Sequence, residues 1–422
     1  MSSTSTPDAG YRRTIAACYL TSASTAATQN LSALLFLTFR SMYGISFSKL
    51  GMLILVYFGT QILVDLTFSF FSDRFSLSAS MKATPVFITV GLILFSAAPL
   101  IFPSAVYVGL VLGTVCFSVG SGLSEVLASP ITEAIPSKNP QKVLSGLHAC
   151  YAWGVVVTVL LATAFIFAFG AENWQVMMLL FALPPLAASL LFIGAPIPYL
   201  ETTSGAAGAL RLFRNPDTAL CMLCIFLGGA AECSMSSWCS SYLEAAVGIP
   251  KVWGDIFGVA LFGVMLGLGR TLYTKFGGSI GRVLILCASS ASVCYLVAVF
   301  ARVPLVGLAA CALTGLATSM LWPGSLILSA ERVPEGGVAM YALMAAGGDS
   351  GASLVPQLIG IVTDAVIASA AGAEYAARFS LSAEQFGMKC GLAVAALFPT
   401  LAVVMFIVEV SRGKRAKAAH NS

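Results

Sequence analysis

Apolar runs separated by short polar or Pro/Gly-containing breaks follow one another along the whole chain. A membrane-spanning helix needs about 20 mostly apolar residues, and each run is close to that length or longer. Twelve such runs lie near 13–39, 48–71, 83–102, 104–135, 142–170, 173–196, 217–243, 251–274, 282–300, 304–330, 337–366 and 386–411. The pattern therefore predicts an all-α polytopic membrane protein with twelve transmembrane helices.

The break between the sixth and seventh runs is the most polar in the chain and contains Arg211 and Arg214. It predicts an N-terminal six-helix bundle over 1–198, a cytoplasmic linker over 199–216 and a C-terminal six-helix bundle over 217–422 with a short basic tail. A repeat supports this division, because Glu133-x-x-Pro136 recurs 198 residues later as Glu331-x-x-Pro334. Two such units in the same orientation form a parallel repeat that encloses a central cavity.

Composition agrees with this pattern and excludes other classes. Hydrophobic residues make up 58% of the chain and charged residues 9%, whereas a soluble domain has roughly 25% charged residues. The net charge is +4, and no basic run outside the C-terminal tail fits a nucleic-acid backbone. The 11 cysteines lie within apolar runs, so we interpret them as small buried hydrophobes and predict no metal site and no cofactor.

The distribution of Lys and Arg in the loops predicts the orientation. With the N-terminus inside, fifteen of these residues fall on the cytoplasmic side and six on the outer side. We therefore expect a multi-pass protein of the cell (inner) membrane with both termini in the cytoplasm. The basic tail from Arg412 to Lys417 is expected to anchor at the inner leaflet.

Ionisable residues inside predicted spans are costly, so each is a functional hypothesis. The set is Asp65, Glu125, His148, Glu232, Arg270 and Asp349. Glu125 lies between Gly122 and Pro130, where an apolar helix disfavours the charged carboxylate and allows a proton to be bound and released. The alternative for Glu125 is a structural hydrogen-bond network.

His148 and Tyr151 lie one turn apart and share a helical face. We interpret His148 as a second proton-coupling candidate, and the alternative is a histidine that is satisfied within the core. Arg270 neutralises one of the buried acids or Asp255, or extends toward the cytoplasmic surface. The residues assigned to a conformational latch are Asp65, Asp73, Arg74 and Arg270.

Three tryptophans occur near these polar groups rather than at helix ends, and neutral amides lie at matching depth. Aromatic faces beside carboxylates and amides suit a sugar ring or an organic cation. The predicted substrate-binding residues are Gln29, Asn30, Tyr151, Trp153, Glu232, Trp238, Trp322, Asp349 and Gln357. The alternative for each tryptophan is plain helix packing.

Twelve spans in a six-plus-six parallel repeat with a polar linker resemble the major facilitator superfamily. The segments Gly122-Leu-Ser-Glu125, Ser129-Pro130 and 147–154 are similar to the fucose:proton symporter branch. The resemblance implies that Glu125 is the proton-coupling acid. Ser129 stands where that branch has Asn, and His148 has no counterpart there.

The first functional hypothesis is a secondary transporter that carries a small polar solute, of sugar or polyol type, together with protons. A second hypothesis is a proton-coupled exporter of amphipathic or cationic compounds. A remote third is an intramembrane enzyme, which the sequence disfavours because an aspartyl protease needs Gly-x-Gly-Asp and residue 346 is Ala. The expected partners are the solute, protons and the lipid bilayer, and we expect a monomer.

Overall fold

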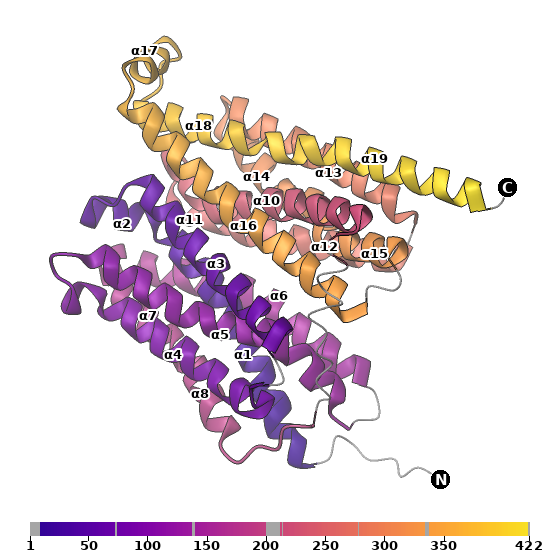
Figure 1. Cartoon of the computed structure of the whole chain (residues 1–422). Coiled ribbons are helices and arrows are strands. Elements are labelled where there is room, and N and C mark those ends of the chain that lie inside the picture. Colours follow the sequence, from indigo (N-terminus) through magenta and orange to yellow (C-terminus); the bar gives the residue numbers. More distant parts are fainter. Residues whose placement is uncertain are drawn as a thin grey trace, which may run out of the picture. The chain divides into compact units, whose positions relative to one another are not determined.

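The computed structural model is built from helices joined by short connections (Figure 1). It describes residues 9–71, 74–136, 140–199, 212, 214–276, 278–333 and 337–420. No strand occurs among these residues. The predicted all-α class is therefore confirmed for the described part of the chain.

The first six predicted spans correspond to helices or pairs of helices. Their bounds are α1 Arg12–Leu34 with α2 Phe36–Tyr43, α3 Phe47–Phe71, α4 Leu77–Ile101, α5 Val106–Ala134, α6 Pro140–Phe169, and α7 Trp174–Phe181 with α8 Leu183–Phe192. The third span starts earlier than the predicted residue 83, because the Ser76 side chain caps the helix by accepting a hydrogen bond from the Ala79 amide at 3.3 Å.

The last six spans are also present, and several contain an interruption. Their bounds are α10 Pro216–Ala245, α11 Lys251–Gly254 with the π-helical turn Asp255–Ala260 and α12 Leu261–Phe276, α13 Ile280–Phe300, α14 Pro304–Thr318 with α15 Leu321–Arg332, α16 Gly337–Ala368, and α18 Ala383–Ala395 with α19 Leu397–His420. A short helix, α17 Ala370–Arg378, connects the last two spans.

Eleven segments among the described residues are long and apolar enough to cross a membrane, and α1 is not one of them. Hydroxyl residues are frequent in α1, and many are buried. Thr21 donates a hydrogen bond to the Ala17 carbonyl at 2.7 Å, and Ser24 donates to the Leu20 carbonyl at 2.7 Å. Because α1 packs against α5, α6 and α8, these hydroxyls face other helices, and their hydrogen bonds offset the cost of burial.

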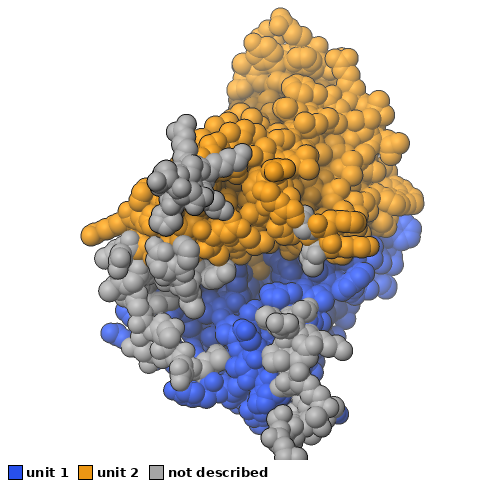
Figure 2. Space-filling view, turned by 90° about the vertical axis from the view of Figure 1, so that its right-hand side faces the viewer, with its two compact units in different colours: residues 1–38, 60–204 blue, residues 39–59, 205–422 orange. Residues whose placement is uncertain are grey.

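The described chain divides into two compact units (Figure 2). Unit 1 comprises residues 1–38 and 60–204, and unit 2 comprises residues 39–59 and 205–422. The end of the first span and the start of the second thus group with the second half of the sequence. Most of the predicted linker, residues 200–211 and 213, lies outside the described residues.

Each unit has its own apolar core. In unit 1, Ala17 of α1 packs with Leu127 of α5, Leu147 of α6 and Phe192 of α8. In unit 2, a separate cluster joins α10, α13, α15 and α19 through residues that include Leu227, Leu284, Leu321 and Phe406. By packing the helices together, each core fixes where the polar residues of those helices lie within its own unit.

A glycine with a left-handed backbone follows the first span of each half of the sequence. Gly44 has φ +64° and Gly248 has φ +78°, and a Cβ built on either would meet no atom within 4 Å. Glycine at these two positions is therefore required by the left-handed backbone, not by space.

Candidate functional site

Glu125 of α5 is the proton-coupling candidate from the sequence, and its side chain is exposed although residues 120–124 are buried. One turn earlier on the same face, the Ser121 hydroxyl lies 3.0 Å from the hydroxyl of Thr28 on α1. Residues four apart on a helix share a face. The α1 contact therefore fixes the face of α5 that carries Glu125.

Asp65 of α3 lies beside Glu125 within unit 1. A carboxylate oxygen of Asp65 lies within 4.8 Å of one of Glu125. The Asp65 side chain is buried, at 5% exposure, and neither of its carboxylate oxygens has a hydrogen-bond partner among the described residues. Two carboxylates this close repel each other when both are ionised, and protonation of either one relieves the repulsion.

The sequence assigned Asp65 to a conformational latch, and its position beside Glu125 does not test that assignment. Asp73, the second acid of the predicted latch, lies outside the described residues. Arg74 is exposed, and its guanidinium carbon lies 5.2 Å from the centre of the Phe71 ring. The latch stays a prediction for Asp65, Asp73, Arg74 and Arg270.

Gln29 and Tyr151, both predicted to bind substrate, contact each other. The Tyr151 hydroxyl on α6 donates a hydrogen bond to Oε1 of Gln29 on α1. His148, one turn before Tyr151, is exposed. The side chain of Asn30 donates to the Ala26 carbonyl of its own helix at 2.8 Å. The structure thus brings together one amide and one phenol at the α1–α6 contact.

Trp153 lies on another face of α6. Its side chain is 67% exposed, and Val157 and Leu161, at helical spacing from it, are also exposed. An exposed apolar face on a membrane helix fits the lipid. This location favours lipid contact for Trp153 over the predicted contact with substrate.

In unit 2, Glu232 of α10 forms an ion pair with Arg270 of α12. Arg270 Nη2 lies 3.4 Å from Glu232 Oε1. Arg270 Nε also donates a hydrogen bond to the Ser319 carbonyl at 3.2 Å. Ser319 lies in the interruption between α14 and α15. Arg270 therefore pairs with an acid, one of the alternatives drawn from the sequence, and also satisfies a carbonyl that the broken helix leaves free.

The interruption at Ser319 is a feature that the sequence analysis missed. The signal lies four residues further on, because Pro323 lacks the N–H that would bond the Ser319 carbonyl within a continuous helix. Broken helices at membrane depth are tolerated where they are packed in protein or line a cavity. At this break, Arg270 supplies the hydrogen bond that Pro323 cannot, and Glu232 pairs with Arg270.

Trp322 follows this break and packs against two glycines. A Cβ built on Gly348 of α16 would lie 2.4 Å from the Trp322 ring, and one on Gly229 of α10 would lie 3.0 Å from it. The ring is partly accessible. Asp349, next to Gly348, is buried at 2% exposure. Gly348 and Gly229 thus let the Trp322 ring approach the backbone beside a buried acid.

Trp238 and Gln357, both predicted to bind substrate, are buried in unit 2. Trp238 Nε1 donates to the Pro356 carbonyl at 2.9 Å, and its ring centre lies 5.9 Å from that of Phe47. A Cβ built on Gly51 would lie 2.9 Å from Oε1 of Gln357. This arrangement favours the packing alternative for Trp238.

Replacing Gly348 with alanine is expected to displace the Trp322 ring. Overpacking of this kind costs about 1–3 kcal/mol, so Gly348→Ala should lower the melting temperature in detergent and weaken solute binding. Gly267→Ala is a matched control, because a Cβ there meets no atom within 4 Å. Equal melting temperatures for the two variants would show that the ring is not held against α16.

Comparison with known proteins identifies the family of the chain. The sequence model described as the Major Facilitator Superfamily matches residues 17–356. The chain belongs to the major facilitator superfamily. No curated protein sequence matches the chain significantly.

Solved structures of several transporters share the fold. A bacterial homologue of the human lysosomal transporter Spinster, in an inward-facing and unoccupied conformation, is 14% identical with a TM-score of 0.73, over 95% of this chain and 97% of that one. The Escherichia coli fucose:proton symporter is 16% identical with a TM-score of 0.59, over 95% and 99%. A D-xylose-proton symporter is 17% identical with a TM-score of 0.69, over 92% and 96%. At these identities, the likeness shows the fold alone.

Proposed function

We propose that this superfamily member couples the entry of a small polar solute to the entry of protons. The observation that carries the proposal is the proximity of the accessible Glu125 carboxyl to the buried, unpartnered Asp65 carboxyl. One acid can exchange protons with water, and the other disfavours the state in which both are charged. Two of the similar structures carry names of proton symporters of sugars, which agrees with this proposal.

The polar groups available for the solute are neutral or paired. Unit 1 offers Gln29 and Tyr151, which are hydrogen-bonded to each other. Unit 2 offers the Glu232–Arg270 ion pair and the partly accessible Trp322 ring. Amides, a phenol and an aromatic face suit a polyhydroxyl solute. A strongly anionic solute would find only Arg270 as a cationic partner in this set, and Arg270 is already paired with Glu232.

Uptake into proteoliposomes with an acidic exterior tests this function. A panel of labelled sugars, polyols, nucleosides, organic acids and amines separates the solute classes, and unlabelled competitors rank them. The proposal expects pH-driven accumulation of a neutral polyhydroxyl compound. Proton-driven expulsion of amphipathic cations, with no uptake of any polyol or sugar, would instead support an exporter.

The proposed setting is the cell membrane, with both termini in the cytoplasm. This orientation follows from the excess of basic residues in the loops on that side. Protease accessibility of a tag fused to the C-terminus, in inverted and right-side-out vesicles, measures it. Cleavage only in inverted vesicles is expected, and cleavage only in right-side-out vesicles would reverse the topology.

A further inference from the structure

The first turn of α3 is capped by a residue far away in the sequence. The backbone amides of Phe47 and Ser48 donate hydrogen bonds to the Asp364 carboxylate of α16 at 3.1 Å and 2.6 Å. The Lys49 amide donates to the Ser46 side chain of the same chain segment at 3.3 Å. The first amides of a helix have no partner within it, and here Asp364 satisfies two of them.

The charge of Asp364 strengthens this contact. A helix N-terminus carries a partial positive charge that favours an anion, and hydrogen bonds to a carboxylate are stronger than those to a neutral oxygen. Both effects require the ionised aspartate. The contact is therefore specific for a carboxylate and is weakened by an isosteric amide.

An ion pair and a cation–π contact flank this cap. Arg40 of α2 lies 3.3 Å from a Glu384 oxygen of α18. The guanidinium carbon of Arg40 also lies 4.1 Å from the centre of the Phe47 ring. Both side chains of the ion pair are partly exposed, so this contact is expected to be weaker than the Asp364 cap.

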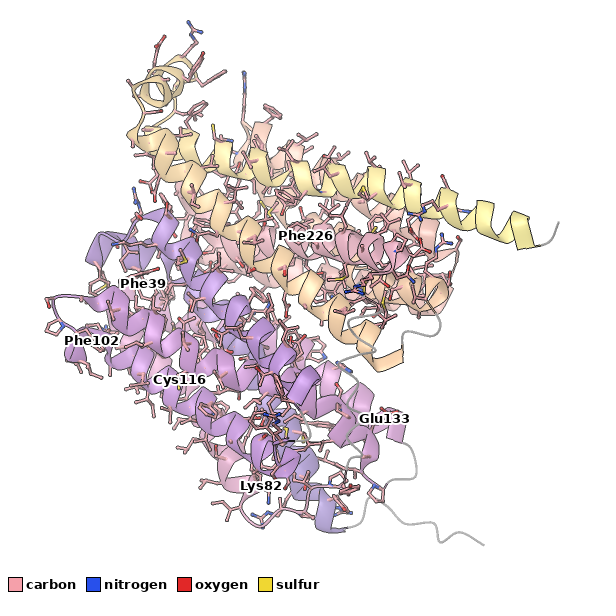
Figure 3. All side chains as sticks on the ribbon, in the orientation of Figure 1. Phe39, Lys82, Phe102, Cys116, Glu133 and Phe226 are labelled. Atoms are coloured by element: carbon pink, nitrogen blue, oxygen red, sulfur yellow. The ribbon has the colours of Figure 1, made fainter. Side chains whose placement is uncertain are left out.

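A closely packed layer lies along the same contact. A Cβ built on Gly360 would lie 2.3 Å from the Phe47 carbonyl oxygen. The Phe47 ring packs against Trp238, which is itself hydrogen-bonded to α16. The stretch from Phe39, labelled in Figure 3, to Gly59 groups with unit 2. Polar contacts at the helix start and apolar packing beside it thus hold this stretch on α16.

We propose that residues 39–51 form a gate of the transporter and that the Asp364 carboxylate holds this gate shut. By sequence, the gate residues belong to the first six spans, while Asp364 and Glu384 belong to the last six. Transporters built from such repeats work by rocking one bundle against the other, so opening on this side separates the two sets. When the two sets separate, water hydrates the Phe47 and Ser48 amides and the Asp364 carboxylate. The opening step is therefore reversible.

The loop-charge pattern assigns this gate to the outer face, because Arg40 and Lys49 fall on that side. The gate acts in the conformational cycle alone. It depends on neither the coupling ion nor the solute. A failure of proton coupling therefore leaves the gate untouched, and a failure of the gate leaves the proposed transport activity open.

A cysteine beside the gate reports its opening. Gln357 is buried at 7% exposure and lies against Gly51, so Gln357→Cys is shielded while the gate is shut. Intact cells are treated with a charged, membrane-impermeant maleimide, and the parent chain gives the baseline for the native cysteines. Adding Asp364→Asn to Gln357→Cys is expected to raise the labelling rate about tenfold.

Two further variants make the outcome decisive. Glu374→Gln removes an exposed carboxylate from α17 without touching the gate and should leave the rate unchanged. Gly360→Val introduces side-chain atoms where Phe47 lies and should raise the rate as Asp364→Asn does. Unchanged labelling in both Asp364→Asn and Gly360→Val, or faster labelling only in inverted vesicles, would overturn the proposed outer gate.

Discussion

Glu125→Gln is expected to abolish concentrative uptake while leaving solute exchange across the membrane intact. Glutamine keeps the shape of the protonated acid and its ability to form hydrogen bonds, but it cannot release a proton. The variant is therefore fixed in a state that resembles the carrier with Glu125 protonated. Labelled solute should still equilibrate between the two sides of a vesicle, and the accumulation ratio under an acidic exterior should fall to about one.

Glu133→Gln provides the matched control for this prediction. Glu133, labelled in Figure 3, lies on the same helix and is exposed at its end. Its replacement removes the same charge without touching Asp65. Retained uphill uptake in Glu125→Gln would remove Glu125 as the coupling acid and direct the search to Glu232 and Asp349. Equal loss of exchange and accumulation would indicate a structural role.

Arg332→Gln is expected to cause the largest loss of stability. Arg332 at the end of α15 forms an ion pair with Glu409 of α19, and it also donates to the Glu409 backbone carbonyl. The Glu409 side chain is almost completely buried, at 1% exposure. Removing one partner of a buried pair costs about 3–5 kcal/mol, because the remaining charge is left buried without compensation.

A double variant distinguishes the effect of an unpaired buried charge from the loss of the contacts themselves. Arg332→Gln with Glu409→Gln should recover much of the stability, as measured by thermal unfolding in detergent. The exposed pair between Arg412 and Asp217, with side chains 48% and 42% exposed, is the control. Breaking it should cost at most about 1 kcal/mol. Equal losses from the two pairs would contradict the role assigned to burial.

The helices were predictable because hydropathy and short polar breaks determine where a chain can cross a bilayer. Even α1, which is too polar for that criterion alone, was found because its small hydroxyl residues adjoin apolar ones. The early start of α4 was missed because its first turn depends on a local cap by Ser76 rather than on hydropathy.

Partners between helices were harder to predict. The sequence identifies Asp65 and Glu125 as costly residues, but their proximity depends on how α3 and α5 pack. Arg270 had several possible acids, and tertiary structure selects Glu232. The same limit applies to aromatic rings, because the sequence cannot show that Trp238 is buried while Trp153 faces outward. Asp364 also lies inside a predicted span, 337–366, but no sequence pattern marks its partners, which are backbone amides.

Proton movement driven by the solute tests the central claim most directly. Proteoliposomes containing a pH-sensitive dye are given solute on the outside, with no pH gradient imposed. Solute entry is expected to acidify the lumen, and Glu125→Gln is expected to take up solute without this acidification. Solute uptake by the parent chain with no change in lumenal pH would contradict proton coupling.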